Sequence, residues 1–418
     1  MDYPDSVQFL YALGNEIRTA KLGLDRIRAV LDALGRPQNR CRFVHVAGTN
    51  GKGSTCAMIE SGLRAAGLRT GLFTSPHIAE PTERIRINGE PVDAGRFAAA
   101  FERVHRAVES LLEAGAIDMH TTYFETVTAM ALVIFAEERM DKVVLEVGLG
   151  GRLDATNVVR PELCVITPID FDHEAFLGRS LESIAGEKAG ILKPGVPAVF
   201  ARQRPEAAPV LDARAEKVGA PVARTTGLQI RNLELHPRGS RFEVGQPALF
   251  IDCPLAGEHQ VENAVTAALA MRSLGISDSS IQAGIARTRW PGRLERVSER
   301  PEIILDGAHN PAAARALAAY IERFYGARRV RLIYGAMRDK AVAEVGGILF
   351  PQAQEVILTA PRQSRAIAPE ALRGLVDHPN LRVAAHIEDA LEMPPGDAVT
   401  FITGSLFLVA EARAILAP

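Results

Sequence analysis

The sequence lacks several features that would indicate a membrane, secreted or nucleic-acid-binding protein. Its 48 basic and 50 acidic residues nearly cancel, so there is no excess of positive charge to neutralise a phosphate backbone or an anionic bilayer. The longest mostly apolar, uncharged runs, 126–136 and 398–410, are well short of the ~20 residues that a membrane-crossing helix needs. The opening MDYPDSVQFL has neither the basic nor the apolar region of a secretory signal. We therefore expect no membrane and no nucleic-acid partner.

Cysteine and lysine are also scarce. The four cysteines lie far apart without CxxC spacing, which is typical of reduced thiols and predicts a cytoplasmic protein. Only seven of the 48 basic residues are lysines. Because the chain uses arginine for nearly every generic positive charge, each lysine is examined individually for a role that requires an amine.

What the sequence does contain is a regular alternation of short β-branched runs and longer helical patterns. The predicted strands cover 42–46, 71–75, 142–147 and 163–167, and the predicted helices cover 55–66, 96–113, 124–139 and 180–189. Alternation of this kind predicts an α/β fold with a mostly parallel sheet covered by helices on both faces. Between 229 and 251, short runs separated by turn residues predict a few antiparallel strands.

A second α/β unit begins after the turn at 290–292. Length alone suggests at least two domains, because 418 residues exceed the ~100–200 residues of a typical domain. Strand and helix patterns restart beyond this turn and continue to the end of the chain. We therefore predict an N-terminal P-loop ATPase domain over 1–289 and a smaller, Rossmann-like α/β domain over 290–418.

The segment AGTNGKGST, 47–55, is the most informative stretch of the chain. Its glycines allow backbone N–H groups to converge on an anion, the following helix adds the positive end of its dipole, and Lys52 supplies a mobile charge for the terminal phosphates. The alternative is a glycine-rich turn that only bends the chain, but strand, loop, lysine and helix occur here in the required order. Gly53 after the lysine departs from the usual Walker spacing and argues against ordinary GTPases and kinases.

These residues also carry a family resemblance. GTNGKGST resembles the ATP loop of the Mur ligase superfamily, and LEVGLGGRLDATN (145–157) with GEKAGI (186–191) resembles the folylpolyglutamate synthase and dihydrofolate synthase family. Further matching segments are TSPH, TERIRING, TYFET, DHEAFLG, AGEHQVENA, PGRLE, DGAHN and TGS. They follow one another in family order from 22 to 405, and the resemblance implies a ligase that uses ATP to join glutamate to a pteroate or folate carboxylate.

The resemblance implies a magnesium site, with one or two Mg²⁺ ions, at Ser75, Glu146 and His173. Glu146 ends an apolar run, where a carboxylate needs either a cation or hydrogen-bond donors; the sequence leaves both readings open. An imidazole is an unusual magnesium ligand, so His173 by itself would be interpreted as a polar loop residue.

Lys188 is the second lysine that the resemblance singles out. In the family this lysine is carbamylated by carbon dioxide, which gives an anionic group that can serve the metal site. The alternative is an exposed lysine paired with a neighbouring glutamate. We name Lys52 and the carbamylated Lys188 as the catalytic residues.

The resemblance also implies the binding residues. The predicted ATP contacts are Thr49, Asn50, Gly51, Lys52, Gly53, Ser54, Asn263, Arg293 and Asp306. The predicted pterin-site residues, which mix the apolar and polar groups that a flat heterocycle needs, are Leu22, Gly23, Leu24, Asp25, Thr122, Tyr123, Phe124, Glu125, Leu153, Asp154 and Ala155. Phe124 is equally compatible with a place in the core, and Asn310 is expected to cap a helix.

The predicted substrates are therefore ATP, L-glutamate and either dihydropteroate or a folate, used by a protein that we expect to be monomeric. The activity would be dihydrofolate synthesis, polyglutamylation or both. Two alternatives remain: another Mur-type amino-acid ligase, and a P-loop ATPase switch that forms no amide.

Overall fold

The computed structural model describes residues 1–13 and 23–417. The chain folds into two compact units, each built from several segments. Unit 1 consists of Met1–Ile169, Ser180–Leu228 and Asn263–Arg287, and unit 2 consists of Asp170–Arg179, Gln229–Glu262 and Thr288–Pro418. Among the described residues, no helix combines the length and apolar character needed to cross a membrane.

Unit 1 contains an eight-stranded sheet in the order β4-β3-β2-β5-β1-β6-β7-β8. Its strands are β1 (Phe43–Ala47), β2 (Thr70–Phe73), β3 (Ile85–Ile87), β4 (Glu90–Pro91), β5 (Lys142–Glu146), β6 (Leu163–Ile166), β7 (Ala198–Phe200) and β8 (Val222–Arg224). From β2 to β8 all neighbours are parallel, and β3 and β4 add an antiparallel edge. The predicted mostly parallel sheet is confirmed.

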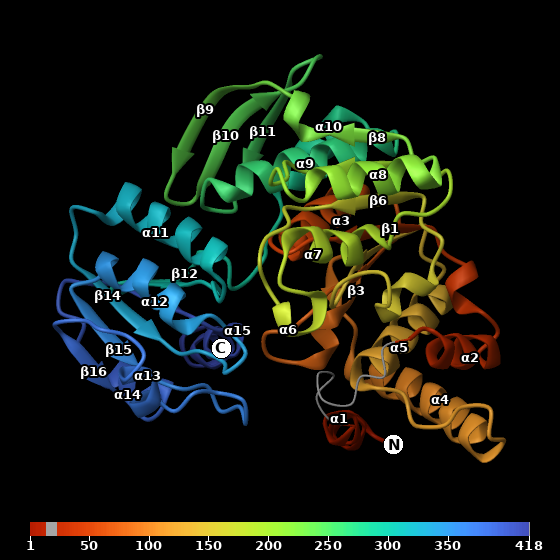
Figure 1. Ribbon diagram of the computed structural model, residues 1–418, viewed down its shortest axis with the longest axis horizontal. Coiled ribbons are helices and arrows are strands. Elements are labelled where there is room, and N and C mark those ends of the chain that lie inside the picture. The colour runs from red at the N-terminus through yellow and green to blue at the C-terminus, as the bar shows by residue number, and fades with distance from the viewer. Residues whose placement is uncertain (14–22, 418) are drawn as a thin grey trace. The chain divides into compact units, whose positions relative to one another are not determined.

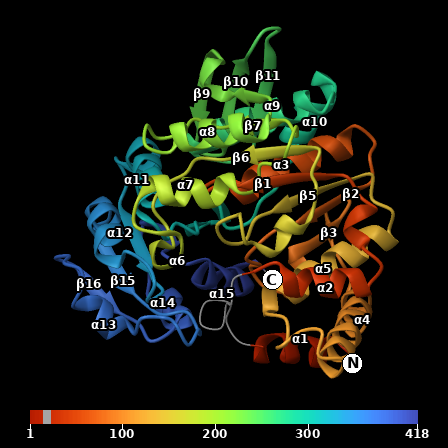
Figure 2. The ribbon, with the colours of Figure 1, turned by 45° about the vertical axis from the view of Figure 1, so that its right-hand side comes forward.

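The helices of unit 1 bury the two faces of this sheet. They are α1 (Tyr3–Ala12), α2 (Asp25–Ala33), α3 (Lys52–Ala65), α4 (Ala94–Glu113), α5 (Tyr123–Glu137), α7 (Leu181–Ala189), α8 (Ala208–Val218) and α10 (Asp278–Ala286), and α9 (His259–Ser273) begins in unit 2 and continues into unit 1. The apolar run noted at 126–136 is the interior of α5, which is buried from Tyr123 to Ala136. Figures 1 and 2 show α2, α4 and α5 side by side, and one apolar core joins α1, α2, α4 and α5 to Phe43, Val143 and Leu145 of the sheet.

Unit 2 contains two sheets. A three-stranded antiparallel sheet, predicted from 229–251, is formed by β9 (Ile230–His236), β10 (Gly239–Val244) and β11 (Leu249–Cys253). The second has the order β12-β13-β17-β14-β15-β16, with strands β12 (Glu295–Glu299), β13 (Glu302–Leu305), β14 (Val330–Tyr334), β15 (Glu355–Leu358), β16 (Leu381–Val383) and β17 (Val399–Thr403). The Tyr320 hydroxyl donates to the Pro237 carbonyl at 2.7 Å, which ties the small sheet to the second half of the unit.

Alternate residues of the six-stranded sheet face different helices. Leu332 and Tyr334 belong to one core with α11 (Pro311–Tyr325) and α12 (Val342–Leu349). Ile333 belongs to another core with α14 (Ile387–Glu392) and α15 (Leu406–Leu416). This period of two is what a strand buried on both faces requires. The remaining helices are α6 (Glu174–Leu177) and α13 (Pro369–Arg373), with short 3-10 helices at Pro37–Asn39, Pro81–Arg84, Ala155–Val158, Thr225–Gly227 and Phe350–Gln352.

The domain division predicted at 289/290 stays a prediction. The last passage of the chain from unit 1 to unit 2 lies between Arg287 and Thr288, close to that boundary. Two earlier segments, Asp170–Arg179 and Gln229–Glu262, also make their contacts with unit 2. Long-range packing of this kind leaves no mark in the local sequence pattern.

Candidate active site

The candidate active site of unit 1 lies where neighbouring parallel strands end. Glu146 is the last residue of β5, and the phosphate loop follows β1, which pairs with β5 on one side and with β6 on the other. Ser75 follows β2, the next strand beyond β5. The carboxyl edge of an open α/β sheet, where the strand order reverses, is the usual place for a ligand in such folds.

The phosphate loop connects β1 directly to α3. The helix begins at Lys52, three residues earlier than predicted, because Gly51 adopts φ +82° and forms the turn that starts it. Lys52 and Gly53 therefore lie in the first turn of α3, whose backbone N–H groups have no acceptor within the helix and whose dipole attracts anions. The Lys52 ammonium is half-buried and donates to the Thr49 carbonyl at 3.1 Å. These residues fit the terminal phosphates of a nucleotide.

Close contacts hold the loop in this conformation. The N–H groups of Thr49 and Asn50 donate to the Pro168 carbonyl at 3.0 and 3.2 Å. A Cβ atom added to Gly48, which has φ +150°, would lie 1.8 Å from the Thr167 hydroxyl oxygen. The loop is therefore shaped by the end of β6, and no larger side chain fits at Gly48.

Asn263 lies directly over the phosphate loop. A Cβ atom added to Gly51 would lie 2.1 Å from the Asn263 side-chain oxygen, and Asn263 is 3% exposed. The structure thus brings together two predicted ATP contacts that are more than 200 positions apart in the sequence. Ser54, a further predicted contact, is buried in the first turns of α3.

Glu146 and Ser75, two of the predicted magnesium ligands, are neighbours. Glu146 is only 4% exposed, and its Oε2 accepts a hydrogen bond from the Ser75 backbone N–H at 3.0 Å. This contact supports both readings that the sequence left open, because a carboxylate accepting one hydrogen bond retains further lone pairs for a cation. A hard cation such as Mg²⁺ fits these oxygen donors.

Lys188 is not the exposed lysine of the alternative reading. It is 5% exposed on α7, and its Nζ donates to the Gly48 carbonyl of the phosphate loop at 2.7 Å. The neighbouring glutamate, Glu187, instead pairs with Arg152 at 2.8 Å. An amine that is 140 positions from Gly48 in the sequence therefore reaches the nucleotide loop.

The first turn of α5 carries four predicted substrate residues. Thr122 and Glu125 form a reciprocal capping box, with Thr122 N–H donating to Glu125 at 2.8 Å and Glu125 N–H donating to Thr122 at 3.2 Å. Arg26 adds a buried ion pair, donating to Glu125 Oε2 at 3.0 and 2.8 Å. Phe124 packs against Gly148 and Phe73 within the apolar core, as its core reading predicts.

Tyr123 is surrounded by residues that sequence analysis did not assign to the site. The Tyr11 ring stacks on it, with centroids 5.9 Å apart and planes at 6°, and the Arg84 guanidinium lies 5.0 Å from its centroid. Arg84 also donates to Nδ1 of His77 at 2.9 Å, and burial, together with the Arg84 charge, lowers the pKa of His77 to about 3. Among the described residues, no carboxylate lies within ion-pair distance of Arg84, which is 8% exposed. An aromatic face beside a buried cation suits a planar, anionic substrate.

Asp154 shapes the loop that follows Glu146. Its two oxygens accept from Leu149 N–H at 2.8 Å and Thr156 N–H at 3.0 Å. Burial raises the pKa of Asp154, although these hydrogen bonds oppose the shift. Ala155 lies in the core beside α5, whereas Leu153 is half-exposed.

The predicted substrate residues near α2 lie at its start. Leu24 is buried and precedes the helix, Gly23 is half-buried, and the side chain of Asp25 is fully exposed. Leu22 lies outside the described residues. The substrate role of these residues stays a prediction.

In unit 2, Asp306 and Arg293 lie together at the end of β13. Asp306 is 7% exposed and accepts from Leu294 N–H and Ala308 N–H, each at 3.0 Å. Burial raises the pKa of Asp306, with the nearby Arg293 charge opposing the shift. The guanidinium of Arg293 donates to its neighbour's carbonyl, Gly292 O, at 3.0 Å. The two predicted nucleotide contacts of unit 2 are therefore neighbours.

His173 belongs to a polar cluster centred on Asp172. Lys340 donates to Asp172 Oδ1 at 2.7 Å, and His309 Nε2 and His173 Nε2 lie 3.5 and 3.8 Å from Asp172 Oδ2. Burial alone would raise the pKa of Asp172, but these partners outweigh it and hold the pKa well below the usual range. Sequence analysis missed Asp172 and Lys340, although the rarity of lysine was a usable signal. Asn310 caps α11 as predicted, accepting from Ala313 N–H at 2.9 Å.

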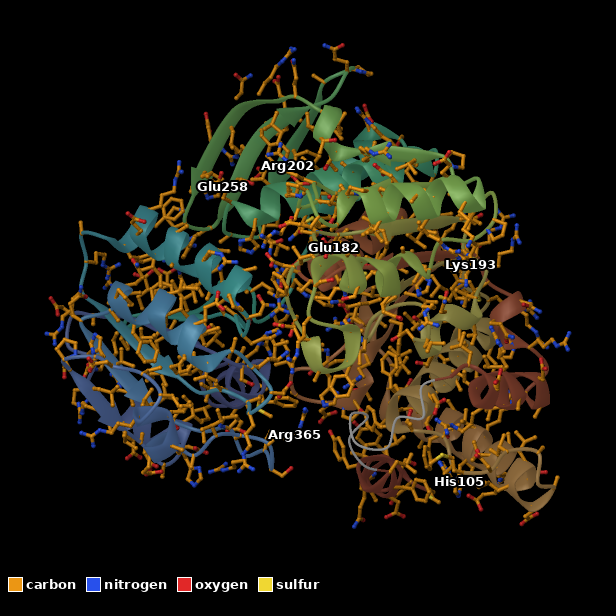
Figure 3. All side chains as sticks on the ribbon, viewed as in Figure 1. His105, Glu182, Lys193, Arg202, Glu258 and Arg365 are labelled. Carbon is orange, nitrogen blue, oxygen red and sulfur yellow. The ribbon has the colours of Figure 1, made fainter. Side chains whose placement is uncertain are left out.

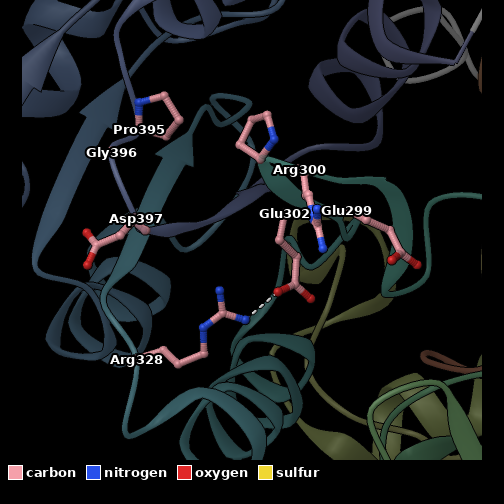
Figure 4. A pocket seen from close by; sticks show the side chains of 9 residues that line it. Glu299, Arg300, Glu302, Arg328, Pro395, Gly396 and Asp397 are labelled. Atoms are coloured by element: carbon pink, nitrogen blue, oxygen red, sulfur yellow. Dashed lines mark hydrogen bonds and ion pairs between the residues drawn. The ribbon is translucent and has the colours of Figure 1, made fainter.

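The hollow drawn in Figure 4 lies elsewhere in unit 2. It has a volume of about 460 Å³ and is lined by 299–302, Arg328 and 395–398. These residues precede or begin β13, β14 and β17, so the hollow lies at the amino edge of the parallel strands, opposite the edge that carries Asp306. It is not where this fold class binds its ligand.

Comparison with known proteins identifies the family. The Mur ligase middle domain matches residues 46–271, and the Mur ligase glutamate ligase domain matches residues 292–406. The dihydrofolate synthase/folylpolyglutamate synthase of Bacillus subtilis is 37% identical, covering 94% of both chains, and the folylpolyglutamate synthase of Lacticaseibacillus casei is 34% identical, covering 100% of this chain and 99% of the relative. A solved Mycobacterium tuberculosis folylpolyglutamate synthase complexed with ADP and AMPPCP superimposes with a TM-score of 0.92 at 33% identity, covering 100% of this chain and 99% of that one. This chain therefore belongs to the folylpolyglutamate synthase and dihydrofolate synthase family of Mur ligases.

Proposed function

We propose that this protein is an ATP-dependent ligase that joins L-glutamate to the carboxylate of dihydropteroate, of a reduced folate, or of both. The observation that carries the proposal is the contact of the buried Lys188 with the phosphate loop, at 2.7 Å, together with the buried Glu146 at the end of β5, the strand next to β1. A P-loop switch also uses a strand-end carboxylate, but it needs no second lysine on its phosphate loop.

The proposed chemistry follows from the difficulty of the reaction. A carboxylate and an amine do not form an amide in water without activation, so the carboxylate first takes the terminal phosphoryl group of ATP. The glutamate amine then attacks the acyl carbon, phosphate leaves with the C–O bonding electrons, and the amine loses a proton. Lys52 and the first N–H groups of α3 would offset the charge of the transferring phosphoryl group.

We propose that Glu146, Ser75 and His173 hold magnesium when the nucleotide is bound. A magnesium ion would supply charge neutralisation for the phosphate oxygens. The buried Glu146 carboxylate supports this assignment, and the Ser75 N–H orients it.

We propose that Lys188 is carbamylated. The neutral Lys188 amine would attack carbon dioxide, form an N–C bond and release one proton, leaving an anionic carbamate whose nitrogen keeps one hydrogen. The carbamate nitrogen can therefore still donate a hydrogen bond to the Gly48 carbonyl, as Lys188 Nζ does in the structure. Arginine cannot make this adduct readily.

We propose that Tyr123 and its neighbours bind the acceptor. The aromatic face of Tyr123 with Tyr11 suits a flat pterin, and the Arg84 cation suits a carboxylate. Thr122, Glu125 and the 153–155 loop would position this surface through the capping and loop contacts described above.

We propose that the C-terminal domain, 290–418, contributes Arg293 and Asp306 to nucleotide binding and that the protein acts as a monomer. The adjacency of these two residues supports their common role. The four free cysteines support a reducing compartment, the cytoplasm.

The Lys188 proposal is tested by substituting the lysine while keeping its charge. In Lys188→Arg we expect ligase kcat to fall at least 100-fold, and in Lys188→Ala we expect acetate to restore part of the activity. Lys193→Arg is the matched control, because Lys193 is a half-buried lysine of the same region whose ammonium, within the described part of the chain, donates only to the Asn157 carbonyl, at 3.3 Å. Carbon-13 NMR with labelled bicarbonate would detect the carbamate directly. A fully active Lys188→Arg variant would show that no carbamate is needed.

The acceptor is tested with purified protein, ATP, labelled glutamate and one acceptor at a time. If only dihydropteroate gives a product, the activity is dihydrofolate synthesis. If only a reduced folate does, the activity is polyglutamylation, and if each acceptor gives a product, the enzyme is bifunctional. ATP hydrolysis that is independent of acceptor and glutamate would instead favour the ATPase switch.

A further inference from the structure

A cluster of metal-binding residue types lies on α4 and the segment after it, and none of its three residues is assigned to the ligase site. His105 and Glu109 are on α4, which Figure 3 labels at His105, and His120 precedes α5. One potential ligand atom from each of the three side chains lies within 4.8 Å of the others. All three residues belong to unit 1.

The backbone brings these three side chains together. His105 and Glu109 are four residues apart on one helix, so they share a face of α4. His105 Nδ1 is 3.9 Å from Glu109 Oε1, and His120 Nε2 is 3.8 Å from the same oxygen. The glutamate thus faces one nitrogen of each imidazole.

The protonation of His120 is set by its neighbour. Its Nδ1 lies 2.9 Å from the Thr121 carbonyl oxygen, which can only accept, so Nδ1 carries the hydrogen. In the neutral ring, the other nitrogen, Nε2, then has its lone pair directed toward Glu109. Metal-bound histidines characteristically donate their second nitrogen to such a carbonyl.

Aromatic packing also orients the two imidazoles. The Phe9 ring centroid lies 4.8 Å from that of His105 and 5.5 Å from that of His120, and Phe101 stacks on His105 at 5.6 Å. His105 Nδ1 and His120 Nε2 are buried atoms without a hydrogen-bond partner among the described residues. Two buried ring nitrogens that lack a hydrogen-bond partner and face one carboxylate are an arrangement that a cation satisfies.

We propose that His105, Glu109 and His120 bind a divalent transition-metal ion of the zinc class. Two imidazoles and a carboxylate suit Zn²⁺, Co²⁺ or Ni²⁺, whereas Mg²⁺ prefers oxygen ligands only. Zinc bonds of ~2.0–2.2 Å in tetrahedral geometry place ligand atoms ~3.3–3.6 Å apart. The two pairs with Glu109, at 3.8 and 3.9 Å, therefore need to close by only a few tenths of an ångström, and the pair of imidazole nitrogens, which lies within 4.8 Å, by at most about 1.5 Å. The Glu109 side chain is 48% exposed, which leaves it free to adjust and gives solvent access to a fourth position.

Metal binding here would act on the segment between α4 and α5. His120 lies two residues before Thr122, the N-cap of α5, so an ion would tie the connection over 114–121 back to α4. We expect bound metal to raise the thermal unfolding midpoint, because it binds the folded arrangement and the unfolded chain does not hold the three ligands together. The site would stabilise this segment of the structure, and the proposal does not depend on the proposed ligase function.

The test is Co²⁺ titration of the full-length protein, stripped with chelator and kept in excess Mg²⁺ so that sites preferring hard cations are occupied. We expect one equivalent of Co²⁺ with visible d–d absorption of a low-coordinate site, displaced by Zn²⁺, and a rise in unfolding midpoint with Zn²⁺. In Glu109→Gln and His120→Gln the affinity should fall at least tenfold and the rise should vanish. Glu113→Gln, an exposed glutamate one turn further along α4, should behave as wild type.

Each result has one meaning. Loss of binding in the two ligand variants but not in Glu113→Gln supports the site. Equal Co²⁺ affinity in all four proteins, or no stoichiometric binding by wild type, overturns it and leaves the cluster as an ion pair between Glu109 and histidine. Glu109→Gln keeps the test decisive if His120→Gln does not fold, because Glu109 is largely exposed.

Discussion

The packing of α10 on α3, the helix that begins at the phosphate loop, depends on a contact between two glycines. A Cβ atom added to Gly284 of α10 would lie 2.3 Å from Gly62 Cα and 2.4 Å from Gly62 N on α3. The Ser61 hydroxyl donates to the Gly284 carbonyl at 2.7 Å. The substitution Gly284→Ala should therefore push the two helices apart.

The size of the effect follows from these distances. Carbon atoms prefer to be ~3.5–4.0 Å apart, so the backbones must separate by more than an ångström, and no flexible side chain can absorb the shift. Overpacking of this kind costs roughly 1–3 kcal/mol, and loss of the Ser61 hydrogen bond costs about 1 kcal/mol. Replacing glycine by alanine also stabilises a helix by about 1 kcal/mol, because alanine has the higher helix propensity. We expect a net destabilisation of about 2 kcal/mol, equivalent to roughly 4–8 °C in the unfolding midpoint of a unit of this size.

The control is Gly186→Ala in α7. Gly186 is also helical, but an added Cβ would meet nothing within 4 Å. The same chemical change should therefore stabilise the protein by about 0.5–1 kcal/mol. Calorimetry of both variants would show midpoints shifted in opposite directions. If Gly284→Ala were as stable as wild type, the close approach of α3 and α10 would be wrong.

Two further predictions concern the phosphate loop and a buried histidine. Lys52→Ala should lower ligase kcat/KM at least 100-fold while changing the free energy of unfolding by less than about 0.5 kcal/mol, since the Lys52 ammonium donates to no described residue other than Thr49, at its carbonyl. Near-normal turnover would refute the phosphate-binding assignment. Burial, together with the charge of Lys193, lowers the pKa of His45 to about 3. Below the usual histidine pKa of ~6.5, the unfolded chain therefore takes up a proton that the folded chain does not. The free energy of unfolding that is present above pH ~6.5 is then lost at about 1.4 kcal/mol per pH unit as the pH falls toward 3. Between pH 7 and pH 5, the free energy of unfolding measured in urea should therefore fall by roughly 2 kcal/mol less in His45→Gln than in wild type. An equal fall in both proteins would contradict a neutral buried imidazole.

Local patterns were sufficient to predict the elements that carry the phosphate loop. The buried strand, the glycine turn and the helix were recognisable because each has its own periodicity or conformational requirement. The start of α3 at Lys52 rather than at 55 was missed because glycine and serine in the first turn resemble a loop, whereas Gly51 in fact forms the turn that begins the helix. The cap of α11 by Asn310 depends only on neighbours in sequence, and it was predictable.

Partners that are distant in sequence could not be derived in this way. Arg26 and Glu125 pair across 99 positions, and Lys340 and Asp172 across 168. Each residue alone resembles an ordinary surface charge, and only the fold shows that the pair is buried. The stacking of Tyr11 on Tyr123 could not be predicted for the same reason, because the apolar periodicity of α1 is weak and its partner lies on α5, far along the sequence.

The most direct test of the account follows the oxygen atoms of the acceptor. Dihydropteroate or reduced folate, whichever is used, is labelled with ¹⁸O in its reacting carboxylate and incubated with the protein, ATP, Mg²⁺ and glutamate. If the carboxylate is activated as an acyl phosphate, each amide formed transfers one ¹⁸O to inorganic phosphate, which mass spectrometry detects. Amide formed with unlabelled phosphate would contradict activation by phosphoryl transfer, and ATP hydrolysis without any amide would contradict the ligase assignment itself.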